Sequence, residues 1–266
     1  MLSGGITVPA YTTYTERDYE YIIDDCEPTI IFISNKLQYE KIKSIIFKKK
    51  YIKKIIIFDL IDNLDKNFHI DINEIFQSKD IKDDKIFEKK INRQEAACII
   101  YTSGTQGNPK GVVLSHGGIL NNCEGSCGLL NTIISKEPKF LTWLPLSHSY
   151  EHTVQFVQIA VGAKVFYAES IEKLIKNMNE CKPEIMTAVP RFYQNLHQKI
   201  NLSFSKAKGV KKILIEKTIL LGKKVLLKKD LSLSEKIINL ICEKTVRIKI
   251  RKQFGGSLKA FVSGGG

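Results

Sequence analysis

Short apolar runs alternate with helical patterns along most of the chain. The runs are rich in Ile, Val, Phe and Tyr, and each has the length of a single strand. They predict strands over 29–33, 54–58, 97–101, 112–115, 140–144, 163–167, 185–189 and 258–263. Strands that alternate with amphipathic helices indicate an α/β fold with layered, mainly parallel β-sheets and flanking helices.

Two helix starts are visible in the same pattern, at Thr15 and Ser170, because each can cap the helix that follows. The apolar face of the first helix is predicted to comprise Tyr19, Ile22, Ile23 and Cys26. That of the second is predicted to comprise Ile171, Leu174, Ile175 and Met178. Residues 59–93 are dominated by Asp, Lys and Asn, which predicts an irregular, solvated connection.

The composition is that of a globular protein of 266 residues, with 43% hydrophobic and 26% charged residues. This length allows one large domain or two smaller ones. No apolar run reaches the roughly 18 residues of a membrane span. The six cysteines form no C-x-x-C pair, so we predict reduced thiols in a cytoplasmic protein and no metal site in this chain.

The net charge of +13 is local to the end of the chain. Residues 1–198 hold 24 basic and 24 acidic residues, whereas 199–266 hold 17 basic and 4 acidic. Apolar spacing predicts two helices there, over 210–229 and 234–254, the second closed by Gly255 and Gly256. This segment either contacts an anionic membrane surface, at the inner face of a membrane, or is a solvated face of ordinary helices. Nucleic-acid binding is not expected, because aromatic residues for base stacking are few.

The stretch with the clearest chemistry is 101–112, which reads Y-T-S-G-T-Q-G-N-P-K-G-V. Glycines let backbone N–H groups approach phosphate oxygens, hydroxyls donate further hydrogen bonds, and Lys110 adds a positive charge. It is not a Walker A loop, because Pro109 stands where the second Gly belongs and Gly111 replaces the Ser or Thr. The alternative reading is a plain solvent loop that joins two strands as a hairpin.

This stretch closely resembles the phosphate-binding signature of the AMP-forming acyl-CoA synthetases, with Gln106 where that family usually has Thr. Residues 143–152, W-L-P-L-S-H-S-Y-E-H, are similar to its long-chain motif L-P-L-S-H-x-x-E-R, with His152 in place of Arg. Residues 189–193 resemble its V-P-R-x-Y element and 261–265 the start of its V-S-G-G-A element. Residues 4–11 are similar to its G-x-x-x-V-P-x-Y region, and 40–95 match only loosely.

The resemblance implies a fold and a reaction. Residues 1–266 are expected to form part of the large N-terminal, AMP-binding domain of a long-chain fatty acid CoA ligase, with 199–256 a basic helical insertion. Such enzymes join a fatty acid to ATP as an acyl-adenylate, releasing pyrophosphate, and then transfer the acyl group to coenzyme A. Mg²⁺ normally bridges the phosphate oxygens.

Site residues follow from the same resemblance. Contact with the ATP phosphates is expected from Thr102, Ser103, Gly104, Thr105, Gln106, Gly107 and Lys110. The acyl or adenylate pocket is expected at His148, Gly264 and Gly265.

Two alternative roles remain open for each of two residue pairs. Glu151 and Arg191 are expected either to form a structural ion pair or, in the case of Arg191, to lie near the substrate. Trp143 and Tyr150 are expected either to line an acyl channel or to pack in the core.

The resemblance also implies that the chain is incomplete, because the family's small C-terminal domain and its catalytic Lys have no counterpart here. A separate chain would then supply the missing half. The alternative is an inactive fragment that retains only part of the ATP site and binds a membrane surface weakly.

Overall fold

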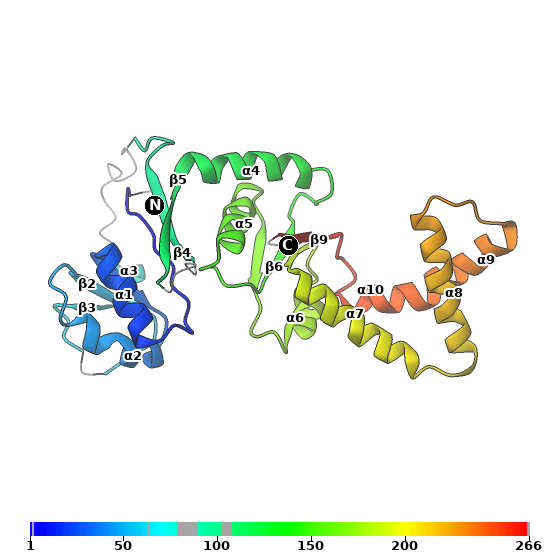
Figure 1. Ribbon diagram of the computed structural model, residues 1–266, viewed down its shortest axis with the longest axis horizontal. Coiled ribbons are helices and arrows are strands. Elements are labelled where there is room, and N and C mark those ends of the chain that lie inside the picture. Colours follow the sequence, from blue (N-terminus) through cyan, green and yellow to red (C-terminus); the bar gives the residue numbers. More distant parts are fainter. Residues whose placement is uncertain (2, 63, 79–89, 103–107, 265–266) are drawn as a thin grey trace. The chain divides into compact units, whose positions relative to one another are not determined.

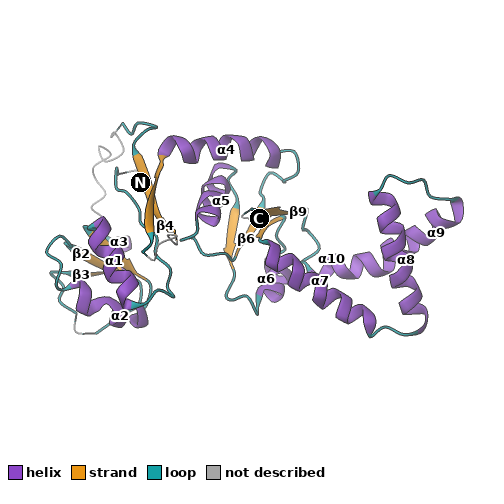
Figure 2. Ribbon diagram, viewed as in Figure 1, coloured by secondary structure: helices purple, strands orange, loops and turns teal. Residues whose placement is uncertain are grey.

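The computed structural model describes residues 1, 3–62, 64–78, 90–102 and 108–264. They fall into two compact units, Met1–Asn121 and Asn122–Gly266. Figures 1 and 2 show the helices and strands of each unit.

The first unit contains a three-stranded parallel sheet in the order β1-β2-β3. Its strands are β1 (Ile30–Ile33), β2 (Lys54–Ile57) and β3 (His69–Asp71), and its helices are α1 (Glu16–Cys26), α2 (Lys36–Ile46) and α3 (Ile72–Gln77). α1 begins after Thr15 as predicted, because Thr15 and Asp18 cap each other's backbone reciprocally. Apolar side chains of α1 and α2 pack on Ile55 and Ile57 of β2 to form the core of this unit.

A separate antiparallel hairpin follows in the same unit. It consists of β4 (Ala96–Thr102) and β5 (Lys110–Ser115), and α4 (His116–Leu130) begins directly after it. The Thr7 N–H donates to the Ala97 carbonyl and the Ile99 N–H donates to the Thr7 carbonyl, so the N-terminal segment lies beside β4.

The second unit contains a four-stranded parallel sheet in the order β7-β6-β8-β9. The strands are β6 (Lys139–Thr142), β7 (Lys164–Tyr167), β8 (Ile185–Ala188) and β9 (Ala260–Ser263), and the helices that follow β6 and β7 are α5 (Ser149–Ala160) and α6 (Leu174–Cys181). Every residue of β8 is buried, as expected for a central strand of a covered parallel sheet. The prediction of an α/β fold with mainly parallel sheets is confirmed.

The basic segment forms a helical arm, which we define as residues 190–256. It comprises α7 (Pro190–Ser205), α8 (Gly209–Leu226), α9 (Leu233–Cys242), a π-helical turn (Glu243–Arg247) and α10 (Ile248–Gln253). α8 packs against α9 and the π-helical turn, while α10 returns to contact α6 (Figure 1). The two predicted helices are present, but the second is interrupted by the π-helical turn. None of the helices in the described ranges is long and apolar enough to cross a membrane.

Two local predictions are wrong. The segment 59–93 is not irregular throughout, because it contains β3 and α3. β3 is only three residues long, and it forms by pairing with β2, where His69 lies opposite Ile55. The local sequence pattern therefore does not predict it. The helix expected from Ser170 begins at Leu174, since 171–173 form a turn, and Ile171 and Ile175 are exposed.

Candidate nucleotide-binding site

The hairpin β4–β5 holds the two ends of the glycine-rich loop together. Thr102 and Lys110 are paired across the ladder, so the loop leaves and returns at neighbouring positions. Both side chains are exposed, and within the described ranges Lys110 forms no ion pair. The expected phosphate contacts Ser103, Gly104, Thr105, Gln106 and Gly107 lie outside the described residues. A free ammonium beside a hydroxyl at the mouth of such a loop suits a phosphate ligand.

Tyr101 anchors the hairpin to α1 within the first unit. Its hydroxyl donates a hydrogen bond of 2.6 Å to Oδ2 of Asp25 in α1. Burial and this carboxylate raise the pKa of Tyr101 far above its usual range, so it stays a donor. Gly111 lies opposite the ring, where a Cβ would stand 3.2 Å from Tyr101 Cζ and 3.0 Å from Ile99 Cγ2. Asp25 carried no signal in the sequence, because its partner is distant along the chain.

In the second unit, the three segments that resemble family motifs all follow the carboxyl ends of parallel strands, at one edge of the sheet. From β6 the chain crosses to β7 on one side and then to β8 on the other, so the topology switches direction between β6 and β8. Ligands of open parallel sheets bind beyond the carboxyl ends of the strands at such a point. The segment from Trp143 follows β6, the segment from Val189 follows β8, and Gly264 follows β9.

Two of these segments touch through Tyr150. Its hydroxyl donates to the Val262 carbonyl at 2.8 Å, and its ring lies so close to Gly264 that a Cβ there would stand 2.4 Å from Tyr150 Cε2. Gly264 is therefore needed for this contact. His148 caps α5 by accepting from the Tyr150 N–H at 3.3 Å through Nδ1, and its ring is exposed. Gly265 lies outside the described residues.

Trp143 belongs to a packed aromatic cluster. Its Nε1 donates to the Thr187 carbonyl at 2.7 Å, and its ring lies 5.5 Å from that of Phe192, which in turn lies 5.7 Å from Phe261. These rings pack against the core that contains Leu141 and Met178. Core packing therefore explains Trp143 in this structure.

Glu151 is fully buried, and the ion pair with Arg191 is not formed. Arg191 is exposed. Neither carboxyl oxygen of Glu151 has a partner with hydrogen-bond geometry in the described part of the chain. Burial raises the pKa of Glu151, and the hydroxyls of Thr187 and Thr142 offset this only in part. The structure therefore does not support the ion-pair alternative, and the sequence motif could not reveal how deeply Glu151 is buried.

The raised pKa of Glu151 predicts a dependence of stability on pH. A carboxyl whose pKa is higher in the folded state costs nothing below its ordinary value of 4.5 and destabilises increasingly as pH rises toward the folded value. We expect Glu151→Gln to stabilise the chain at pH 8 relative to the parent by about 1–2 kcal/mol, and to make no such difference at pH 4.5. Urea titration at both pH values measures this.

The matched control is Glu137→Gln, because Glu137 is exposed and pairs with Lys164 at 2.6 Å. Its pKa is lowered by that contact, so removing its charge is not expected to stabilise the chain at pH 8. A Glu151→Gln variant that is less stable than the parent at pH 8 would show that Glu151 is ionised and satisfied in the folded state.

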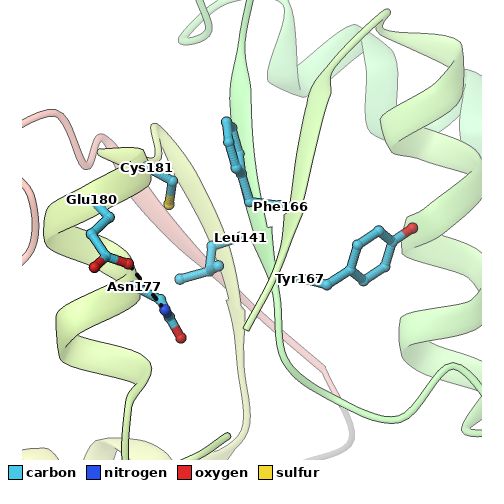
Figure 3. Close-up of a pocket in the computed structure, with 6 residues that line it drawn as sticks. All are labelled: Leu141, Phe166, Tyr167, Asn177, Glu180 and Cys181. Carbon is cyan, nitrogen blue, oxygen red and sulfur yellow. Dashed lines mark hydrogen bonds between the residues drawn. The ribbon is translucent and has the colours of Figure 1, made fainter. Parts of the chain in front are cut away.

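A cavity of about 280 Å³ lies elsewhere in the second unit, between α6 and strands β6 and β7. Figure 3 shows Asn177, Glu180 and Cys181 of α6 facing Leu141 and Phe166, with Tyr167 pointing away from them. Its polar groups are already bonded: Asn177 Nδ2 donates to Glu180 Oε2 at 3.3 Å, and the Tyr167 hydroxyl donates to Gln155. None of the predicted site residues lines it, so we do not assign the site to this cavity.

No cluster of three or more His, Cys, Asp or Glu side chains that could hold a metal ion occurs in the described ranges.

The chain matches the family described as AMP-binding enzyme over residues 1–266. Long chain acyl-CoA synthetase 5 of Arabidopsis thaliana is 28% identical over 97% of this chain and 40% of its own length. The adenylation domain of a carboxylate reductase from Mycobacterium chelonae has a TM-score of 0.63 at 15% identity, over 97% of this chain and 39% of that one. A long-chain-fatty-acid-CoA ligase from Archaeoglobus fulgidus has a TM-score of 0.54 at 25% identity, over 69% of this chain and 34% of that one.

These matches agree with the expected fold and family. The chain spans about 40% of the length of the curated relatives it matches first. It belongs to the AMP-binding enzymes, and the relatives it resembles in sequence are named long-chain acyl-CoA synthetases.

Proposed function

We propose that this chain supplies the ATP-phosphate site of a long-chain fatty acid CoA ligase. The reaction converts ATP, fatty acid and coenzyme A to acyl-CoA, AMP and pyrophosphate through an acyl-adenylate. The observation that carries the proposal is the position of Lys110 opposite Thr102, at the two ends of the glycine-rich loop; its side chain is exposed and has no ion-pair partner among the residues that the structure describes. Family membership and the names of the relatives support it.

Each residue of the proposed site has a defined task. Lys110 would hold the β- and γ-phosphates and offset the charge that develops on pyrophosphate as it leaves. Thr102 would donate its hydroxyl to the same oxygens, and Ser103, Gly104, Thr105, Gln106 and Gly107 would add hydroxyl, amide and backbone N–H donors. Mg²⁺ would neutralise the triphosphate, and coenzyme A would accept the acyl group. The fit rests on the free cation and hydroxyl, which match a polyanion.

The acyl-adenylate pocket is proposed at the switch point of the second unit. His148 offers an exposed ring there, Gly264 follows β9 directly, and Gly265 would complete the pocket. We also propose that 1–266 is part of the large AMP-binding domain and that 199–256 is its basic insertion. Complete catalysis would also need the family's catalytic Lys, which lies in its small C-terminal domain. The same polypeptide or a separate chain would supply that domain.

The alternative is a non-catalytic role, in which the chain retains part of the ATP site and contacts an anionic membrane surface through 199–256. The observation that favours it is the local positive charge of 199–256, which holds 16 basic and 4 acidic residues. In both cases the protein would work in the cytoplasm, with peripheral contact at the inner face of a membrane.

Isotope exchange between ATP and pyrophosphate distinguishes the two functions. The 266-residue chain is incubated with palmitate and Mg²⁺, beside Lys110→Ala as a control. Exchange that Lys110→Ala reduces about a hundredfold supports the ligase for this chain by itself. A folded chain that shows no exchange, either alone or mixed with the remaining part of a long-chain relative, supports the non-catalytic alternative. Exchange that Lys110→Ala leaves unchanged contradicts the proposed phosphate site.

A further inference from the structure

The tip of the helical arm presents apolar side chains to solvent. Leu226 ends α8, Leu227 follows it, and Leu233 begins α9; their exposed fractions are 82%, 64% and 81%. On α9 the exposed apolar face continues through Ile237, Leu240 and Ile241, which follow Leu233 at i+4, i+7 and i+8. A helix packed on its own protein buries such a face, and α9 exposes it.

The opposite side of α9 already has its partner. Cys242 is fully buried, and its Sγ points to the Leu214 carbonyl of α8 at 3.8 Å. Arg247, just beyond α9, donates to the Thr218 carbonyl of α8 at 3.4 Å. The contact between α8 and α9 therefore uses the less apolar side of α9 and leaves the apolar side free for another partner.

The tip is held in one conformation by hydrogen bonds. The N–H groups of Lys228 and Lys229 donate to the carbonyls of Val225 and Lys224, each at 3.0 Å. Ser232 and Glu235 form a capping box at the start of α9, and Glu235 also pairs with Lys224 of α8. The leucines are therefore presented by an ordered turn.

Positive charge surrounds these leucines. Lys223, Lys228, Lys229 and Lys236 are exposed around the tip, and the acids there are Glu235, which pairs with Lys224, and exposed Asp230. The whole segment 199–256 holds 16 basic and 4 acidic residues. A second copy of the chain would bring like charges together. An anionic lipid surface instead offers headgroups that attract the lysines and an apolar layer that accommodates the leucines.

We infer that the arm tip inserts Leu226, Leu227 and Leu233 into the interface of an anionic lipid bilayer, while the surrounding lysines bind the headgroups. The inference rests on the membrane contact proposed above and names the residues that make it. Apolar insertion adds to the electrostatic attraction, so binding will survive salt better than a purely charged contact. It does not depend on ATP binding.

The test is co-sedimentation of the 266-residue chain with vesicles of phosphatidylcholine containing about 30 mol% phosphatidylserine. The parent is compared with the triple variant Leu226→Ser, Leu227→Ser, Leu233→Ser. The matched control is Leu37→Ser, Leu60→Ser, Leu129→Ser, because those leucines are 72%, 82% and 71% exposed and lie outside the arm. We expect about a tenfold loss of affinity in the tip variant and no change in the control.

Insertion is read directly from Leu233→Trp with brominated lipids. We expect quenching of this tryptophan, whereas Trp143, the single tryptophan of the parent, is half-buried in the core and is not quenched. Binding of the tip variant equal to that of the parent, with no quenching, would overturn the insertion and leave a purely electrostatic contact. No binding of the parent to anionic vesicles at low salt would overturn the membrane contact itself. Loss of self-association in the tip variant, without vesicle binding, would identify a second copy as the occupant.

Discussion

Replacing Lys110 by alanine is expected to weaken ATP binding to this chain by about tenfold to a hundredfold, equivalent to about 1.4–2.7 kcal/mol. The ammonium is exposed and has no ion-pair partner within the described ranges, so it is available to a phosphate. Its position opposite Thr102 places it at the mouth of the glycine-rich loop. Titration calorimetry with Mg·ATP measures the loss. The exposed side chain packs on little, so the variant should fold as the parent does.

Lys136→Ala is the matched control, because Lys136 is also exposed and forms no ion pair in the described part of the chain, and it lies outside the loop. It removes the same charge and should leave ATP affinity within about twofold of the parent. Equal losses in both variants would mean that ATP responds to net charge and that Lys110 makes no specific contact.

Gly255→Ala is expected to destabilise the chain by about 2–4 kcal/mol. Gly255 has a φ of 79°, and a Cβ there would stand 2.3 Å from the Met178 carbonyl oxygen and 2.9 Å from Lys182 Cα. Both are backbone atoms at the end of α6, so neither can move aside cheaply. The left-handed conformation costs about 1 kcal/mol for alanine, and overpacking adds about 1–3 kcal/mol. The affected contact joins the base of the arm to α6.

Gly256→Ala separates these two costs. Gly256 has the same φ of 79°, but a Cβ there meets nothing within 4 Å. It should lose only about 1 kcal/mol in a urea titration, so the difference between the two variants reports the contact with α6. Similar losses at both positions would show that α10 does not pack against α6 as described.

The strands could be predicted from the sequence because each is a short apolar run bounded by polar residues. Every predicted strand is present, although β6 ends two residues earlier than expected, at Thr142. Gly255 and Gly256 were correctly expected to close the last helix of the arm. β3 could not be predicted, because three residues carry no period and its pairing with β2 depends on the fold.

The candidate site was predictable only in part. The loop motif identified Lys110 and Thr102, and the structure pairs them across the hairpin. The anchoring contact from Tyr101 to Asp25 and the deep burial of Glu151 depend on tertiary packing, which no local motif encodes. The exposure of the apolar face of α9 could not be predicted either, since the spacing of its apolar residues is that of an ordinary packed helix.

The most direct test of the proposed nucleotide site compares the affinity of the chain for Mg·ATP with its affinity for AMP. If the loop between β4 and β5 holds the β- and γ-phosphates, ATP should bind at least about tenfold more tightly than AMP, and Lys110→Ala should remove most of that difference. AMP binding as tight as ATP binding, or no ATP binding by a folded chain, would contradict the assignment.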